Sequence, residues 1–218
     1  MKESKIKPTE RNLPLQKRAR EKYEQILEVA CHMLVEGGYA KLSTREIARR
    51  ADCNIATIYR YFGGVNDIIK ALGEPFLSGI SQLLDLMLGM AYRGESLESI
   101  FRFFLFQLTK EIDDNRWLLH AEAATLIDKD LIAWDIQLMN KIEVKLSSVL
   151  SAALPSKDFW EIEILAFRLV RHWKSYLRCL IEFESLEKTT WLTVDTVHTS
   201  IALVSTPIQS NQDLLSME

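Results

Sequence analysis

The feature that most constrains this chain is a pair of short helix signals separated by a three-residue turn, within residues 42–62. Ser43 is followed three residues later by Glu46, the capping-box pattern that starts a helix. Asn54 is a favourable N-cap for a second helix directly after the turn. The two expected helices cover residues 44–51 and 55–62, and residues 52–54 form the turn.

Apolar residues inside this segment can form a small core that fixes the angle between the two helices. They are Ile47, Ala48, Ala51, Cys53, Ile58 and Phe62. This arrangement is typical of a helix-turn-helix, whose second helix enters the major groove of DNA. A plain helical hairpin with a surface cluster of aromatic residues is the alternative, because short patterns of this kind also arise by chance.

Side chains expected on the surface of this segment suit contacts to DNA. Thr44 and Arg45 begin the first helix and can meet a phosphate through side chain and backbone N–H. Ala56 and Thr57 are small enough to approach base edges in the first turn of the second helix. The other residues expected at the DNA are Asn54, Tyr59, Arg60 and Tyr61.

The rest of the chain has the pattern of long helices. The 218 residues include only 8 Gly and 5 Pro, which disfavours a fold built from many strands and turns. Apolar residues recur at three- and four-residue steps before Gly37 and Gly38, which predicts a first long helix from Lys17. We therefore predict an all-α fold of about nine helices. The later helices are expected near residues 66–90, 96–113, 115–126, 129–153, 156–184 and 189–204.

Charge is distributed unevenly along the chain. Residues 1–65 carry 13 Lys and Arg against 8 Asp and Glu, whereas the remaining residues carry 14 against 22. A basic first part on an acidic body indicates an anionic partner at one end only. A solvated charged tail explains the same asymmetry, since several of the lysines precede residue 8.

Several other classes of protein are disfavoured. No apolar run is long enough to cross a membrane and the first residues lack a secretory signal, so we expect a cytoplasmic protein. No phosphate-binding, dinucleotide-binding or hydrolase motif is present, so we expect no enzyme and no cofactor. The three cysteines and four histidines are widely separated, so no metal site is expected.

The stretch from Arg18 to Leu72 resembles the N-terminal domain of the tetracycline-repressor (TetR/AcrR-type) family of bacterial regulators. It covers about a quarter of the chain. The residues that carry the resemblance are Ile26 through Ala30, Gly38-Tyr39, Ser43-Thr44, Ile47-Ala48, Ala51, Asn54, Ile58 through Phe62, and Ile68.

The resemblance implies a function and a set of partners. Members use their first three helices to bind DNA, and most repress transcription until a small molecule releases them. The partners implied here are double-stranded DNA, a second copy of the chain and an apolar or amphipathic effector. A helical protein-interaction module, or a regulator that has lost its effector response, is the alternative. The expected parts are a flexible basic arm (1–16), a DNA-binding domain (17–65), an effector-binding and dimerisation domain (66–206) and a frayed tail (207–218).

Two positions depart from the family's pattern. Asp52 stands in the turn where the family usually has Gly, and Asp reaches the left-handed conformation only at a cost. Val65 stands where the family usually has a Lys that meets a phosphate. We therefore expect a normal fold with altered or weaker anchoring to the DNA backbone.

The later helices supply candidates for the dimer interface and the effector pocket. Two broad apolar faces could pack as a four-helix bundle between two subunits, or pack only within one subunit. The expected interface residues are Phe159, Ile162, Ala166, Leu169, Trp173, Val194, Val197 and Ile201. A pocket needs an apolar lining with few polar groups, although any of these aromatic side chains could equally be ordinary core. The expected pocket residues are Phe104, Trp117, His120, Trp134, His172 and Tyr176.

Overall fold

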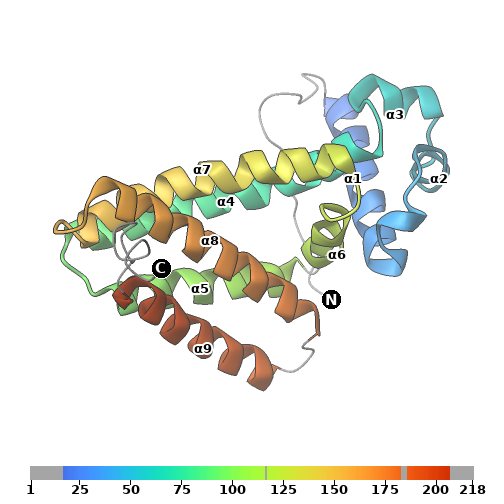
Figure 1. The fold of residues 1–218 in the computed structure, drawn as a ribbon. Coiled ribbons are helices and arrows are strands. Elements are labelled where there is room, and N and C mark those ends of the chain that lie inside the picture. The colour runs from blue at the N-terminus through green and yellow to red at the C-terminus, as the bar shows by residue number, and fades with distance from the viewer. Residues whose placement is uncertain (1–16, 116, 183–185, 207–218) are drawn as a thin grey trace, which may run out of the picture. The chain divides into compact units, whose positions relative to one another are not determined.

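The chain is mostly helical in the part that the computed structural model describes, which is residues 17–115, 117–182 and 186–206. Within these ranges it forms nine α-helices, one 3-10 helix and no strand (Figure 1). The predicted all-α fold is confirmed. The arm predicted over residues 1–16 and the tail predicted over residues 207–218 lie outside the described residues.

The first elements follow the predicted order. They are α1 (Lys17–Gly37), the 3-10 helix η1 (Tyr39–Lys41), α2 (Thr44–Arg50) and α3 (Ile55–Tyr61). Gly38 ends α1 as predicted: it has a φ of 68°, and its N–H donates to the carbonyl of Leu34 at 2.8 Å. Glycine adopts this left-handed backbone without the steric cost that other residues meet.

The remaining helices also lie close to their predicted positions. They are α4 (Val65–Tyr92), α5 (Leu97–Asp114), α6 (Trp117–Ala124), α7 (Lys129–Ala153), α8 (Phe159–Glu182) and α9 (Leu186–Ser205). Gly94, with a φ of 76°, separates α4 from α5. Pro155 lies between α7 and α8, where its ring cannot continue a helix.

The helices pack into two compact units. The first unit contains the chain up to Gln82 together with Lys110–Leu138. Its buried core combines side chains of α1, α2 and α3 with residues of α6 and the first turn of α7, including Trp117, Ala121 and Leu131. The domain boundary predicted at residue 65 stays a prediction. The helix α4 begins at that residue, and its first turns contribute to the core of the first unit.

The second unit contains Leu83–Thr109 and the chain from Met139 onward. In it α8 and α9 run side by side in opposite directions (Figure 1). The Trp173 ring of α8 packs against Phe101 and Phe104 of α5, with ring centroids 5.5 and 4.7 Å apart. Its indole N–H donates to Ser200 Oγ of α9 at 2.9 Å. Trp173 therefore joins three helices of this unit through both apolar and polar contacts.

Candidate nucleic-acid interface

Both predicted N-caps are present, Ser43 directly before α2 and Asn54 directly before α3. Ser43 Oγ accepts a hydrogen bond from the backbone N–H of Glu46 at 3.1 Å. Asn54 Oδ1 accepts one from the backbone N–H of Ala56 at 2.9 Å. These caps satisfy backbone donors that a helix leaves unpaired at its start. They determine where two helices of only seven residues each begin.

The predicted core of this segment is confirmed. Five of its six residues are buried, and Cys53 is half-buried and packs against the same cluster. Tyr23 of α1 closes the core on one side, because its ring stacks on Phe62 with centroids 4.9 Å apart. The angle between α2 and α3 is therefore set by apolar packing against α1.

The turn between α2 and α3 contains a strained residue. Asp52 has a φ of 46°, the one non-glycine with positive φ among the described residues. This is the left-handed conformation that the sequence predicts for this position. Lys22 of α1 contributes to the same turn: its Nζ donates to the carbonyl oxygens of Ala51 and Asp52 at 3.3 and 3.4 Å. A lysine at this end of α2 also suits the negative end of the helix dipole.

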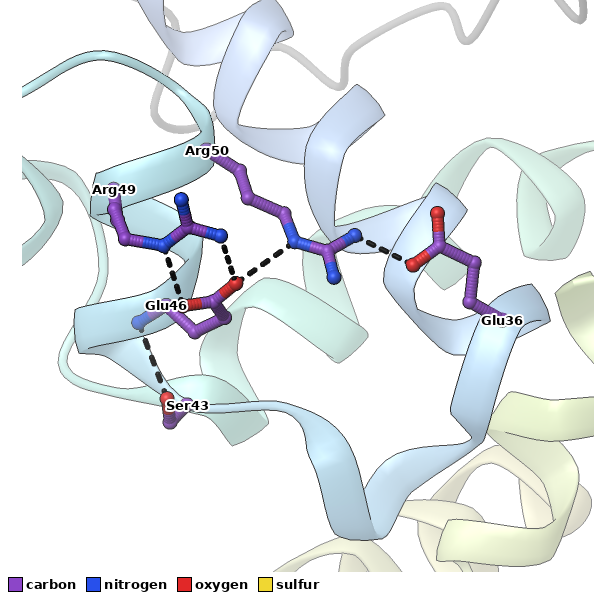
Figure 2. Close-up of polar contacts among 5 residues, drawn as sticks. All are labelled: Glu36, Ser43, Glu46, Arg49 and Arg50. Atoms are coloured by element: carbon purple, nitrogen blue, oxygen red, sulfur yellow. Dashed lines mark hydrogen bonds and ion pairs between the residues drawn. The ribbon is translucent and has the colours of Figure 1, made fainter.

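Two carboxylates and two guanidinium groups form a connected set of contacts on α2, and the contact between Arg50 and Glu36 joins α2 to α1 (Figure 2). The Glu46 carboxylate accepts hydrogen bonds from Arg49 at 2.6 and 2.8 Å and from Arg50 at 2.9 Å. Arg50 also donates to Glu36, at the end of α1, at 2.5 Å. The hydrogen bonds from Arg49, followed by those from Arg50, lower the pKa of Glu46 to about 2. The two arginines in the last turn of α2 are therefore engaged by acidic groups.

The structure brings some of the predicted DNA contacts together on the surface. Thr44 Oγ1 at the start of α2 lies 3.3 Å from the hydroxyl of Tyr59 on α3, and the Tyr59 side chain is 56% exposed. Arg45 and Ala56 are exposed and Thr57 is half-exposed. Two helices thus present hydroxyl groups side by side, a geometry in which both could meet one phosphate.

Arg60 and Tyr61 differ in how accessible they are. The Arg60 guanidinium is exposed and lies over the ring of Tyr61, 5.0 Å from its centroid. Tyr61 is half-buried and packs edge-on against Tyr23 at 6.0 Å. Asn54 is exposed, but its side-chain oxygen is used in capping α3. Tyr61 and Asn54 therefore have structural roles besides any contact with DNA.

The residues predicted to form a pocket are divided between the two units. Trp117, His120 and Trp134 belong to the first unit, and Phe104, His172 and Tyr176 belong to the second. The Tyr176 hydroxyl is buried and already contacts two threonine hydroxyls, those of Thr109 and, at 2.8 Å, Thr193.

Two of these side chains contain buried polar atoms without a partner. In the described part of the chain, Nε1 of Trp117 and Nε2 of His172 are enclosed and contact no hydrogen-bond partner. Buried polar groups are normally paired, so an unpaired one needs an explanation such as a bound ligand or water. Among the six residues predicted for a pocket, only Trp117 and His172 have such an atom in the described part of the chain.

The residues predicted at the dimer interface are mostly inside the second unit. Ile162, Ala166, Leu169, Trp173 and Val197 are at most 4% exposed, and Val194 and Ile201 are half-buried. Of the eight, Phe159 alone is strongly exposed, at 74%. The apolar surface available to a second subunit on α8 therefore consists of Phe159 with Trp160, Ile164 and Phe167, which we call the α8 apolar surface.

Sequence reasoning missed three groups of polar contacts in this region. The contacts of Lys22 with the turn, of Arg50 with Glu36, and of Tyr39 with Asp128 all join residues far apart in the sequence. Periodicity and capping rules describe neighbours three or four residues apart, so no local signal identifies such pairs.

Comparison with known proteins identifies the N-terminal segment. Residues 26–72, which contain α2, α3 and their core, match the sequence profile of "Bacterial regulatory proteins, tetR family". Over this segment the chain is similar to the tetR family. The match includes Ser43, Asn54 and the left-handed turn between them, so the geometry above is that of a tetR-type domain in this chain.

Two curated relatives are named transcriptional repressors. The chain is 38% identical over 58 residues to the HTH-type transcriptional repressor KstR of Mycolicibacterium smegmatis. The aligned residues make up 26% of this chain and 28% of that repressor. It is 27% identical over 148 residues to KstR of Mycobacterium tuberculosis. This second alignment covers 66% of this chain and 64% of that repressor. The chain thus spans under two thirds of the length of these relatives.

Solved structures share the fold over a greater length. The structure of the transcriptional regulator FadR from Bacillus subtilis in complex with stearoyl-CoA aligns with a TM-score of 0.59 at 16% identity, over 86% of this chain and all of that chain. Identity at this level supports the fold alone. The likeness of fold therefore extends beyond residue 72 and over most of the chain.

Within the described ranges, no group of three or more His, Cys, Asp or Glu side chains could hold a metal ion. Among the same residues, no helix has both the length and the apolar character needed to cross a membrane.

Proposed function

We propose that this protein is a DNA-binding transcription regulator that binds a pseudo-palindromic operator as a homodimer. The observation that carries the proposal is the segment from Ser43 to Phe62. Its two capped helices pack on a buried core, and it presents Thr44, Tyr59 and Arg60 on its surface. A helix-turn-helix of this kind positions its second helix for the major groove.

The sign of regulation follows from the relatives. Two curated relatives are named transcriptional repressors. We therefore propose that this chain represses transcription and is located in the cytoplasm. The proposal includes no catalytic step.

Release by a small molecule is the second part of the proposal. A structural neighbour is a regulator solved with stearoyl-CoA, which supports an apolar or amphipathic effector here. His172 Nε2, a buried polar atom without a hydrogen-bond partner in the described part of the second unit, is the atom that an effector would satisfy. Coupling between effector and DNA is reciprocal, so the operator should weaken effector binding by the same factor.

The first experiment is selection of bound sequences from a random pool of duplex DNA, with the purified full chain at low salt. We expect enrichment of a near-palindrome whose half-sites lie about one helical turn apart. No enrichment by a folded protein would contradict specific DNA binding.

A matched pair of variants tests the contact surface on the selected operator. Arg60→Gln should weaken binding and reduce the salt slope, since each lost phosphate contact reduces its magnitude by about 1. Arg102→Gln removes the same charge from α5 in the second unit and should leave affinity unchanged. Equal effects of the two variants would indicate only a general charge effect.

A helical protein-interaction module is the competing function. Such a module, with a net charge of −3, should not be retained on heparin or duplex DNA at low salt, because like charges repel. Retention that Arg60→Gln weakens would favour the regulator.

A further inference from the structure

Three polar side chains from distant parts of the sequence meet in the first unit. They are Tyr39 of η1, Asn66 in the first turn of α4, and Asp128 in the loop between α6 and α7. The Tyr39 hydroxyl lies 2.9 Å from Asp128 Oδ2, to which it donates, and 3.0 Å from Asn66 Oδ1. Asn66 Nδ2 donates to Asp128 Oδ1 at 2.9 Å. Each side chain therefore contacts both of the others.

Asp128 is also the N-cap of α7. Its Oδ1 accepts hydrogen bonds from the backbone N–H groups of Asp130 and Leu131 at 3.0 and 3.2 Å. One carboxylate thus accepts from four donors in three segments of the chain. The hydrogen bond from Tyr39 is the largest of the effects that lower the pKa of Asp128.

The position of these contacts relates them to the helix-turn-helix. Tyr39 lies shortly before α2, and Asn66 lies shortly after α3. The two ends of the DNA-binding segment are therefore joined to each other and to the start of α7. All of these contacts are partly buried, so water screens them less than it screens the exposed pairs on α2.

We propose that Asp128 is a positioning residue for DNA binding, which fixes both ends of the helix-turn-helix segment through Tyr39 and Asn66. The loop between α6 and α7 thereby controls the affinity of a surface to which it contributes no contact. This inference rests on the proposed function, because it concerns how that function is regulated.

Charge and positioning predict opposite effects at this residue. Asp128 is negative, and DNA is a polyanion, so removal of the carboxylate by itself should tighten binding. Loss of positioning should weaken it, since the recognition helix would no longer be held in one orientation. The sign of the change in affinity therefore separates the two explanations.

The test compares three variants of the full chain on the operator selected above. We expect Asp128→Ala to raise the Kd about tenfold. Asp128→Asn should bind within about twofold of wild type, because asparagine is also a good N-cap and its amide can satisfy both Tyr39 and Asn66. Asp130→Ala is the matched control, since it removes the same charge from the first turn of α7.

The dependence of affinity on salt provides a second measurement. Asp128→Ala should keep the salt slope of wild type, because the phosphate contacts remain. If Asp128→Ala instead binds as tightly as Asp130→Ala, or more tightly, the inference is wrong. Thermal unfolding of each variant shows whether it is folded at the assay temperature.

Tyr39→Phe keeps the inference testable if Asp128→Ala does not fold. It removes one hydroxyl, leaves the charge unchanged and should also raise the Kd, whereas affinity equal to wild type would overturn the proposal. Absence of DNA binding by wild type would be a different result: it would reject the proposed function, and this inference with it.

Discussion

At the scale of single residues, Asp52 holds a backbone conformation that costs stability. Its φ of 46° lies in the left-handed region, which costs an L-residue roughly 1–2 kcal/mol. Aspartate is among the residues that tolerate this region best, because its short side chain can bond locally. The sequence predicts this strain because Asp stands where the family has Gly.

Replacement of Asp52 tests the cost directly. Asp52→Gly relieves the strain but loses about 0.4–1 kcal/mol through the greater freedom of glycine in the unfolded chain. We expect a net gain of about 0.5–1 kcal/mol in the free energy of unfolding, measured by urea denaturation. Asp52→Ala removes the same charge but keeps a Cβ, so it should destabilise the protein. A gain with both replacements would mean that charge, not backbone strain, dominates.

Val65 is the second residue at which the family's pattern is broken. It begins α4, is half-buried and packs against the core of the first unit. Val65→Lys should tighten operator binding and steepen the salt slope by about 0.9 for each added phosphate contact. Val65→Gln controls for loss of the apolar contact without adding charge. Equal affinity and slope for the lysine and glutamine variants would show that no phosphate lies within reach.

At the scale of elements, α2 is held by its ion pairs as well as by its core. Glu46 has its pKa lowered to about 2 from an ordinary value of 4.5. A carboxyl whose pKa is lower in the folded state contributes stability above its unfolded pKa and loses it as pH falls. The contribution of Glu46 should therefore be complete above about pH 5 and disappear toward about pH 2.

The variant Glu46→Gln isolates this contribution. Its unfolding temperature should lie below that of wild type at pH 7, by a small amount because the pairs are exposed. The difference should shrink as the pH falls from about 4.5. Glu98→Gln, which breaks one exposed pair with Arg102 at 2.7 Å, is the control for loss of a single surface interaction. If the difference in unfolding temperature between wild type and Glu46→Gln stays constant from pH 7 to pH 3, the pKa of Glu46 is not lowered in the folded state.

Most of the elements could be predicted because their signals are local. Ser43 and Asn54 lie at the helix starts that capping rules require, and Gly38 ends α1. The contacts of Tyr39 with Asn66 and Asp128 could not be predicted, because they depend on how three segments pack. Capping rules identify a residue by its neighbours in the sequence, whereas those contacts span 27 and 89 residues.

At the scale of the whole molecule, the sequence could not distinguish packing within one subunit from packing between two. Both bury an apolar helix face with the same periodicity. The structure buries Ile162, Leu169 and Trp173 within the second unit. It leaves the α8 apolar surface exposed, with Phe167 at 50% and Trp160 at 44%. We propose that this surface, rather than the inner face of α8, meets the second subunit.

The environment of Phe167 supports an interface at the α8 apolar surface. Arg171 lies over the Phe167 ring, 4.6 Å from its centroid, and pairs with Glu143 of α7 at 2.7 Å. The ring is therefore held in place before any partner binds, and less conformational entropy is lost on association. Clustered exposed apolar side chains on a helix typically mark a protein interaction site.

A dimer that forms through this surface should dissociate when charge is placed in it. In a two-fold interface each Phe167→Glu substitution occurs twice, and buried like charges oppose association. We expect the Phe167→Glu variant to sediment as a monomer and to keep its helical circular-dichroism signal. Its affinity for the operator should fall, because the two half-sites are then bound independently. Val35→Glu alters a side chain of similar exposure, 52%, on α1 and should leave the dimer intact. If the Phe167 variant stays dimeric, the subunits must meet through another surface, and the exposed aromatic residues of α8 would need a different partner.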